Sequence, residues 1–193
     1  MRSRLSLMVA VLAPALALQG CAPLVAGGAA TTAAVTSDQR TTGTVIEDQV
    51  IETKAFDFFG ADAGLSQQSR VSATSYNQIV LLTGQTPTDE LRKRAADYAS
   101  RIAKVRHVYN ELEVRAPLTA MQVSADALTT TKVKSKLLTV RDLKSTDVKV
   151  VTENGVVFLM GMLDQATGDA VAEVVAGVAG VRKVVKLFEA PAR

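Results

Sequence analysis

The stretch that decides the fold is residues 148–161, VKVVTENGVVFLMG, and a second copy stands at residues 71–84, VSATSYNQIVLLTG. In each copy, apolar and β-branched residues flank a turn signal, Glu153-Asn154-Gly155 in one and Tyr76-Asn77-Gln78 in the other. Asn-Gly between such runs is a strong hairpin signal, because both residues readily take positive φ. Each copy therefore predicts two antiparallel strands, of which the second is nearly all apolar and covered on both faces.

Both hairpins belong to a longer unit that the chain carries twice. Sliding the sequence on itself by about 77 residues brings further blocks into register, in the same order in both halves. The matching blocks are Asp48 and Lys54 with Asp126 and Lys132, and residues 105–108 with residues 181–184. We therefore expect two domains of one fold, at residues 45–115 and residues 123–193.

Before each hairpin the sequence predicts a helix. Largely apolar residues recur at i, i+4 and i+7 or i+8, which is the spacing of one helical face. They are Ile51, Ala55, Phe58 and Phe59 in the first unit, and Thr129, Val133 and Leu137 in the second. Asp48 and Asp126 are expected at the N-caps, where a short acidic side chain accepts hydrogen bonds from the free N–H groups of the first turn.

After each hairpin the sequence predicts a second helix and a last strand. The helix is expected at residues 89–103 or 165–176, and the strand at residues 108–114 or 184–188. The order in each unit is then α-β-β-α-β. The fold class is α+β, with two tandem domains that each pack a small three-stranded mixed sheet on two helices.

The N-terminal segment has the layout of a secretory signal peptide at residues 1–20. Arg2 and Arg4 precede an uncharged apolar run, which is shorter than the roughly 18 to 20 residues of a transmembrane helix. The run ends in Leu-Gln-Gly-Cys, which resembles the lipobox of bacterial lipoproteins. The resemblance implies that Cys21 carries an S-diacylglycerol and an N-acyl chain after cleavage. An ordinary signal peptide beside a free cysteine is the alternative.

Residues 21–44 are rich in Ala, Gly and Thr and nearly uncharged, so we expect a flexible linker. Ala22 follows the cysteine, where lipoproteins retained in the inner membrane of enteric bacteria tend to carry Asp. The resemblance therefore implies an outer-membrane anchor with the protein facing the periplasm. Cys21 is the only cysteine, which excludes an intramolecular disulfide.

The distribution of charge points to an anionic partner. The formal net charge is +3, and a basic cluster in the second unit has only Asp142 nearby to balance it. The cluster consists of Lys132, Lys134, Lys136, Arg141 and Lys144. Nucleic acid is not expected as the partner, because the chain has no Trp and no aromatic residues interleaved with the basic ones.

The sequence offers no residues for catalysis or metal binding. His107 is the only histidine and matches Lys183 in the repeat, so we expect a surface residue at the start of the last strand. Without a second histidine or a free thiol, we expect no metal, no cofactor besides the lipid and no enzymatic activity. Gly84 and Gly161 each end an apolar strand, and we expect both to be structural, where the backbone needs freedom or close packing.

Taken together, these features resemble the BON-domain family, and within it the outer-membrane lipoproteins with two BON domains. The resemblance rests on the lipobox and on residues 79–85, 108–111, 130–139 and 148–161. It implies a non-enzymatic envelope protein that binds anionic phospholipids such as phosphatidylglycerol, gathers at the division site and supports outer-membrane integrity. It also implies a link to the machinery that assembles outer-membrane β-barrels. In the family, the lipid contact is attributed to the first helix of the second domain.

The residues of that helix, expected at residues 126–139, point independently to a membrane surface. At about 100° per residue, its apolar face leaves Leu128 and Leu138 facing outward, and lysines flank them. The phospholipid-binding residues expected are Leu128, Thr131, Lys132, Lys134, Ser135 and Leu138. The leucines would enter the acyl boundary while ammonium groups meet anionic headgroups. Family members can carry Trp where Leu128 stands, and Leu128 could instead staple the start of the helix.

Two hypotheses of different classes follow. The first is a membrane-surface module that recognises anionic phospholipid through the second domain. The second is a protein-interaction adaptor for β-barrel assembly or for division-site factors, with the sheet faces as its docking surface. An envelope-stress holdase is a third reading. We expect a monomer.

Overall fold

The computed structural model describes residues 38–144 and 146–191. The signal peptide, Cys21 and most of the predicted linker lie outside these residues. The first unit consists of α2 (Thr42–Ala61), α3 (Ala63–Gln68), β1 (Arg70–Tyr76), β2 (Ile79–Thr86), α4 (Asp89–Ser100), β3 (His107–Asn110) and β4 (Glu113–Val114). The second unit consists of α5 (Ala120–Leu137), β5 (Val148–Glu153), β6 (Val156–Met162), α6 (Gln165–Ala176) and β7 (Lys183–Glu189). Both units keep the predicted order. The first unit adds α3, and its predicted last strand at residues 108–114 is divided into β3 and β4, so its sheet has four strands instead of three.

Each unit has a mixed sheet with its most apolar strand in the centre. β2 pairs antiparallel with β1 and parallel with β3 and β4, whereas β6 pairs antiparallel with β5 and parallel with β7. The hairpins turn at residues 77–78 and 154–155, which all have positive φ, as a tight two-residue hairpin requires. The predicted α+β class with two mixed sheets is confirmed.

The helix N-caps differ from the prediction. Thr41 and Thr119 cap α2 and α5, well before Asp48 and Asp126, so the predicted N-caps are wrong. Both aspartates lie buried inside their helices, and each carboxylate accepts the two N–H groups of its hairpin turn, at 2.7 and 2.8 Å in each unit. Hydrogen bonds to an ionised carboxylate are strong. The aspartate therefore holds the first helix against the hairpin in the same way in both units.

Gly84 and Gly161 lie inside β2 and β6, which continue beyond them, rather than at the ends of these strands. The neighbouring strand approaches closely at both points. A Cβ on Gly84 would lie 1.9 Å from the carbonyl oxygen of Arg70, and one on Gly161 would lie 2.4 Å from that of Asp147. Gly84 also has a φ of +120°, which favours glycine. Any larger residue would force the backbone to move.

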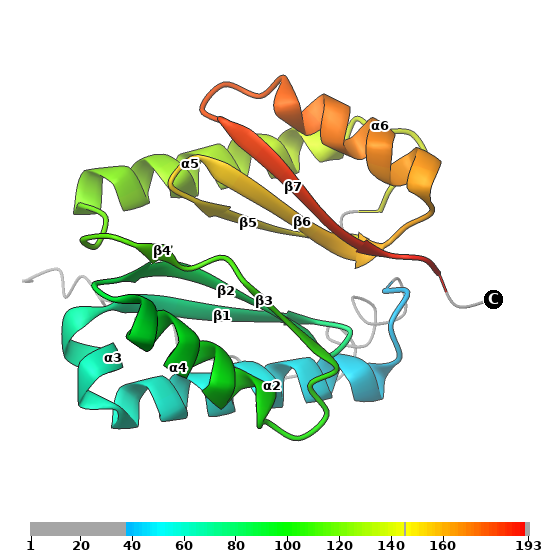
Figure 1. Ribbon diagram of the computed structural model, residues 1–193. Helices are drawn as coiled ribbons and strands as arrows, with labels where there is room; N and C mark the ends of the chain where they lie inside the picture. Colours follow the sequence, from blue (N-terminus) through cyan, green and yellow to red (C-terminus); the bar gives the residue numbers. More distant parts are fainter. Residues whose placement is uncertain (1–37, 145, 192–193) are drawn as a thin grey trace, which may run out of the picture.

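The two sheets face each other in the middle of the molecule, and helices cover their outer faces (Figure 1). Successive side chains of a strand point to opposite faces. In β2, Val80 and Leu82 enter the core beneath the helices, whereas Ile79 and Leu81 enter another core between the sheets. β6 alternates in the same way. This is why both central strands are apolar at nearly every position.

The core between the sheets joins the two units. Its buried members are Tyr76, Ile79, Leu81, Phe158, Met160 and Leu187. Fully burying one such aliphatic or aromatic side chain contributes roughly 1.5–3 kcal/mol. The units are thus held together by a hydrophobic interface and not only by the chain that connects them.

Buried polar contacts fix how the two units pack. Glu153, at the end of β5, accepts hydrogen bonds from Arg70 and Gln85 of the first unit, each at 2.7 Å. Gln85 in turn accepts the N–H of Leu118, which precedes α5, at 3.1 Å. At the other end of the interface, the solvent-exposed Arg106 forms an ion pair with Glu189 at 2.6 Å, which contributes less than the buried contacts. Removing Glu153 or Gln85 would leave buried partners of this network without a hydrogen bond.

This packing removes the surface on which the adaptor hypothesis depended. The inner faces of the sheets bury each other, and the outer faces lie beneath helices, so neither sheet face is free within residues 38–144 and 146–191. A docking partner would have to contact helices or loops.

The N-terminal end of the described chain is held beside the interface between the units. The Arg40 guanidinium lies 4.0 Å from the centre of the Tyr76 ring and pairs with Asp38 and Asp48 at 2.7 Å. Burial raises the pKa of Tyr76 to about 12, so its hydroxyl stays protonated. That hydroxyl lies 3.5 Å from the carbonyl oxygen of Asp147, which follows α5 and precedes β5. The linker therefore joins the folded part near the C-terminal end of α5.

Candidate functional site

The candidate site is built on α5, which is longer than predicted. Thr119 and Gln122 form a capping box that starts the helix at Ala120, six residues before the predicted start at Asp126. Lys134 and Lys136 lie in its last turn, where their positive charges interact favourably with the negative end of the helix dipole and stabilise the helix. Leu128 lies more than two turns inside the helix, so it cannot staple the helix start. The positions for a staple are Leu118 and Val123.

The two faces of α5 differ sharply in burial. Asp126, Thr129, Val133 and Leu137 form its buried face, which confirms the predicted core positions. The opposite side carries an exposed row at alternating spacings of three and four residues, which we call the outward row: Met121, Ser124, Leu128, Thr131, Ser135 and Leu138. Met121, Leu128 and Leu138 are 83%, 63% and 67% exposed. The row spans about 25 Å along the helix at 1.5 Å per residue.

The lysines beside the outward row carry uncompensated charge. Among the described residues, no ion pair involves Lys132, Lys134, Lys136 or Lys144. Elsewhere lysines do find carboxylates, as Lys104 does with Glu47 and Lys149 with Glu52. The basic surface at the end of α5 is therefore free to attract an external anion.

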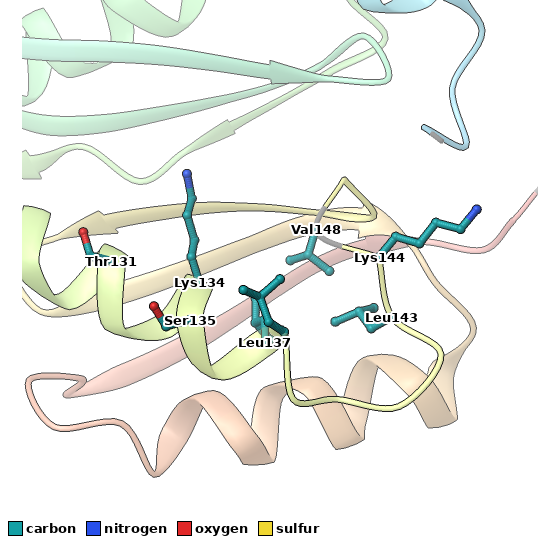
Figure 2. Close-up of a pocket in the computed structure, with 8 residues that line it drawn as sticks. Thr131, Lys134, Ser135, Leu137, Leu143, Lys144 and Val148 are labelled. Carbon is teal, nitrogen blue, oxygen red and sulfur yellow. The ribbon is translucent and has the colours of Figure 1, made fainter. Parts of the chain in front are cut away.

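A pocket of about 380 Å³ opens where α5 ends, and we call it the α5 pocket (Figure 2). Four of the predicted site residues line it: Thr131, Lys134, Ser135 and Leu138. Leu128 and Lys132 do not, because they lie further back along the helix surface. The structure thus divides the predicted residues between an exposed helix face and a pocket.

The other residues of the α5 pocket were not predicted as site residues. They are Leu137, Leu143, Lys144 and Val148. Lys144 belongs to the basic cluster seen in the sequence, which was the one signal available. Leu143 and Val148 look like ordinary core residues, and only the path of the chain after α5 brings them to the pocket.

Hydrogen bonds hold Lys144 at the pocket. The Lys144 N–H donates to the Asp147 carboxylate at 2.8 Å, and the Asp147 N–H donates to the Lys144 carbonyl oxygen at 3.0 Å. Leu137 and Val148 are buried in the core of the second unit. The walls of the pocket are therefore set by the fold before any ligand arrives.

We also searched the described part of the chain for metal sites, for a histidine that could act in catalysis and for membrane-spanning helices. There, no group of histidine, cysteine, aspartate and glutamate side chains is arranged to hold a metal ion. His107 is exposed at the start of β3, as predicted, with its ring edge-on to Tyr109. None of the helices in residues 38–144 and 146–191 has the length and apolar character needed to cross a membrane.

Comparison with known proteins agrees with this architecture. The BON domain family matches residues 47–116 and again residues 125–191. Outer membrane lipoprotein DolP of Haemophilus influenzae is 41% identical over 187 residues, which cover 97% of each chain. The 21 kDa hemolysin of Actinobacillus pleuropneumoniae is 41% identical over 151 residues, or 78% of each chain. Osmotically-inducible protein Y of Escherichia coli is 28% identical over 153 residues, or 78% of this chain and 76% of that one.

The fold and these matches define a protein with two tandem BON domains. The chain belongs to the BON-domain family, as a homologue of outer membrane lipoprotein DolP, and is a non-enzymatic lipoprotein of the outer membrane. The internal repeat found in the sequence corresponds to the two BON domains.

Proposed function

We propose that this lipoprotein uses α5 to bind anionic phospholipid, such as phosphatidylglycerol, on the membrane that holds its anchor, and that this contact supports outer-membrane integrity. The observation that carries the proposal is the outward row, with exposed leucines beside lysines that no carboxylate of the described chain neutralises. Apolar side chains on such a helix enter the boundary between headgroups and acyl chains, while ammonium groups meet the negative surface.

The binding free energy expected from α5 is that of a surface contact and not of a second membrane anchor. Each lysine near an anionic surface contributes about 1 kcal/mol, and each leucine that leaves water contributes at most roughly 1.5–3 kcal/mol. Two acyl chains already give stable attachment. We propose that acylated Cys21 is the anchor, so α5 is not needed to keep the protein on the membrane. Its role is to select where on the membrane the tethered protein stays.

The place where the linker joins the folded part supports this arrangement. Arg40 packs on the Tyr76 ring, and the Tyr76 hydroxyl lies 3.5 Å from the carbonyl oxygen of Asp147, in the segment between α5 and β5. The stretch from Cys21 to Asp38 can reach at most about 60 Å when fully extended. The anchor and α5 can therefore contact the same leaflet.

Flotation with lipid vesicles tests the proposal. The unlipidated mature chain, residues 22–193, is mixed with vesicles of phosphatidylcholine alone or with added phosphatidylglycerol. We expect binding only to vesicles that contain phosphatidylglycerol, and weaker binding as salt rises, because the Debye length falls from about 10 Å at 0.1 M to about 3 Å at 1 M. Equal binding to both vesicles, or binding to neither, would contradict the proposal.

We also propose that the lipid contact enriches the protein at the division site. Support comes from the family resemblance and from the weak, lipid-dependent contact inferred for α5. Fluorescence microscopy of the acylated protein compares wild type with a variant in which Lys132 and Lys134 are replaced by glutamate. A septal signal that persists in the variant would separate localisation from the lipid contact.

A further inference from the structure

We propose that the α5 pocket binds the phosphate headgroup and the first acyl methylenes of one phospholipid molecule, so that the protein recognises an individual anionic lipid in addition to a charged surface. The inference rests on the proposed function and deepens it. A flat charged helix would respond only to the charge density of the membrane. A pocket can also respond to the shape and chemistry of the headgroup.

The lining of the α5 pocket matches an anionic amphiphile. Lys134 and Lys144 flank Leu137, Leu143 and Val148 on either side, with their ammonium groups directed outward, where the flexible side chains can meet a headgroup at the pocket mouth (Figure 2). The lysines come from different elements, and neither takes part in an ion pair within the described residues. A phosphate group would supply the missing negative charge, and the apolar part of the pocket would accept methylenes.

The size of the pocket decides how much of a lipid it can take. Ligand pockets typically measure roughly 300–1,000 Å³, so the α5 pocket, at about 380 Å³, lies at the small end. It has room for a headgroup and the beginning of a chain, but not for a whole phospholipid with two acyl chains. The rest of the molecule has to remain in the bilayer.

The surface around the α5 pocket would allow the acyl chains to remain in the bilayer. Thr131, Ser135 and Leu138 belong both to the pocket and to the outward row. A lipid whose headgroup entered the pocket would therefore keep its tails in the bilayer beneath the exposed leucines. The walls are preformed, because Leu137 and Val148 belong to the core and the Asp147 carboxylate fixes the backbone of Lys144. Preformed walls lower the entropic cost of binding.

The test separates one lipid molecule from a membrane surface. A short-chain phosphatidylglycerol is titrated below its critical micelle concentration into residues 22–193, and amide chemical shifts are followed by NMR. We expect saturable one-to-one binding with shifts at Leu143, Lys144 and Val148, none of which lies on the outward row. Short-chain phosphatidylcholine and glycerol phosphate are the comparison probes, and both are expected to bind at least tenfold more weakly.

Two variants distinguish the pocket from the helix surface. Leu143→Trp places a larger side chain at the pocket, so it should weaken binding of the monomeric lipid at least tenfold. Vesicle binding should be kept, because Leu143 lies outside α5 and the outward row. Lys144→Gln should weaken monomer binding about fivefold, as expected for one lost charge-assisted contact. It changes an exposed side chain outside α5 and should leave the fold intact.

Each outcome has a definite meaning. If the wild type floats with phosphatidylglycerol vesicles but shows no saturable monomer binding, the pocket proposal is wrong and the proposed function stands. If glycerol phosphate binds as well as the lipid, the pocket is a phosphate site and the lipid assignment fails. Parallel loss of monomer and vesicle binding in Leu143→Trp, or unchanged monomer binding in both variants, would also overturn it. A wild type that fails to float refutes the proposed function itself.

Discussion

The first helices of the two domains, α2 and α5, share one scaffold and differ in what they present to solvent. Asp48 in α2 and Asp126 in α5 make the same pair of hydrogen bonds to a hairpin turn, so the two helices can be aligned residue by residue. On this alignment, Leu128 corresponds to Val50 and Lys132 corresponds to Lys54. Any difference in function between the helices must come from their surfaces, because their placement is the same.

Exposed apolar side chains alone do not distinguish them. α2 also exposes Ile46, Val50, Phe56 and Phe58, and Phe56 is 77% exposed. The difference lies in charge. Where α5 has Lys134, Ser135 and Lys136, α2 has Phe56, Asp57 and Phe58. Carboxylates on α2 would oppose an anionic surface, whereas the lysines on α5 attract it.

The segments that follow the two helices differ as well. After α2, Asp62 caps the short helix α3, whose Leu65 is buried in the core of the first domain. After α5, the chain runs without a helix to β5, and its Leu143 and Lys144 form a wall of the α5 pocket. A duplicated fold thus keeps its framework, while charge and one connection give the second copy a different surface.

The largest effect is expected from reversing the charges beside the outward row. Lys132→Glu combined with Lys134→Glu changes the local charge by four units, which at about 1 kcal/mol per charge weakens binding to phosphatidylglycerol vesicles by about 4 kcal/mol, or roughly 1,000-fold. Vesicle flotation measures this. Lys54→Glu on α2 is the matched control and should change binding less than about twofold. An equal loss in the control would show that only net charge matters.

A somewhat smaller loss is expected from Leu128→Glu. The substitution removes an apolar side chain from the interface and adds a negative charge, together about 3 kcal/mol, or roughly 100-fold weaker binding. NMR titration with phosphatidylglycerol micelles should show the loss with the fold unchanged, since Leu128 is exposed. Val50→Glu, at the equivalent and 45% exposed position of α2, should bind like wild type. If Val50→Glu is the weaker binder, the roles of the helices are reversed.

The shared scaffold can be tested through the two buried aspartates. Asp126→Asn and Asp48→Asn each weaken hydrogen bonds to a charged acceptor, which lowers the free energy of unfolding by about 2 kcal/mol. Asp48→Asn should lower the free energy of unfolding further, because this carboxylate also accepts a hydrogen bond from the Ser75 hydroxyl at 2.6 Å and forms an ion pair with Arg40. Urea unfolding followed by far-UV circular dichroism measures both. A larger loss in Asp126→Asn would mean that the turn contacts are not equivalent.

The smallest effect is expected from making α2 more like α5. Asp57→Ser gives α2 the residue that α5 has at Ser135 and removes one negative charge. At about 1 kcal/mol per charge, this should strengthen binding to phosphatidylglycerol vesicles by at most roughly fivefold. The variant is measured in the Lys132→Glu and Lys134→Glu background, where α5 no longer dominates. Flotation with phosphatidylglycerol vesicles should recover slightly. No recovery would indicate that α2 does not reach the membrane at all.

The repeat, the hairpins and the faces of α5 were predictable, because each depends on residues close in sequence. Asn154-Gly155 defines a turn by itself, and a helical period is enough to turn Leu128 and Leu138 away from Val133. The same local reasoning placed Asp48 and Asp126 at N-caps, which was wrong. Nothing within the helix reveals that the N–H groups accepted by these carboxylates come from a turn about 30 residues further along the chain.

Tertiary structure alone decided how the domains pack and where the α5 pocket lies. Arg70 and Glu153 are 83 positions apart, and their contact follows only once the two sheets meet face to face. The unbroken apolar runs of β2 and β6 indicated that both faces of these strands are covered. They do not reveal whether a helix or another sheet covers the second face. Leu143, Lys144 and Val148 likewise reach the end of α5 through the path of the chain. The sequence by itself determined the local elements and their charges, whereas contacts between distant residues determined which of those charges surround a pocket.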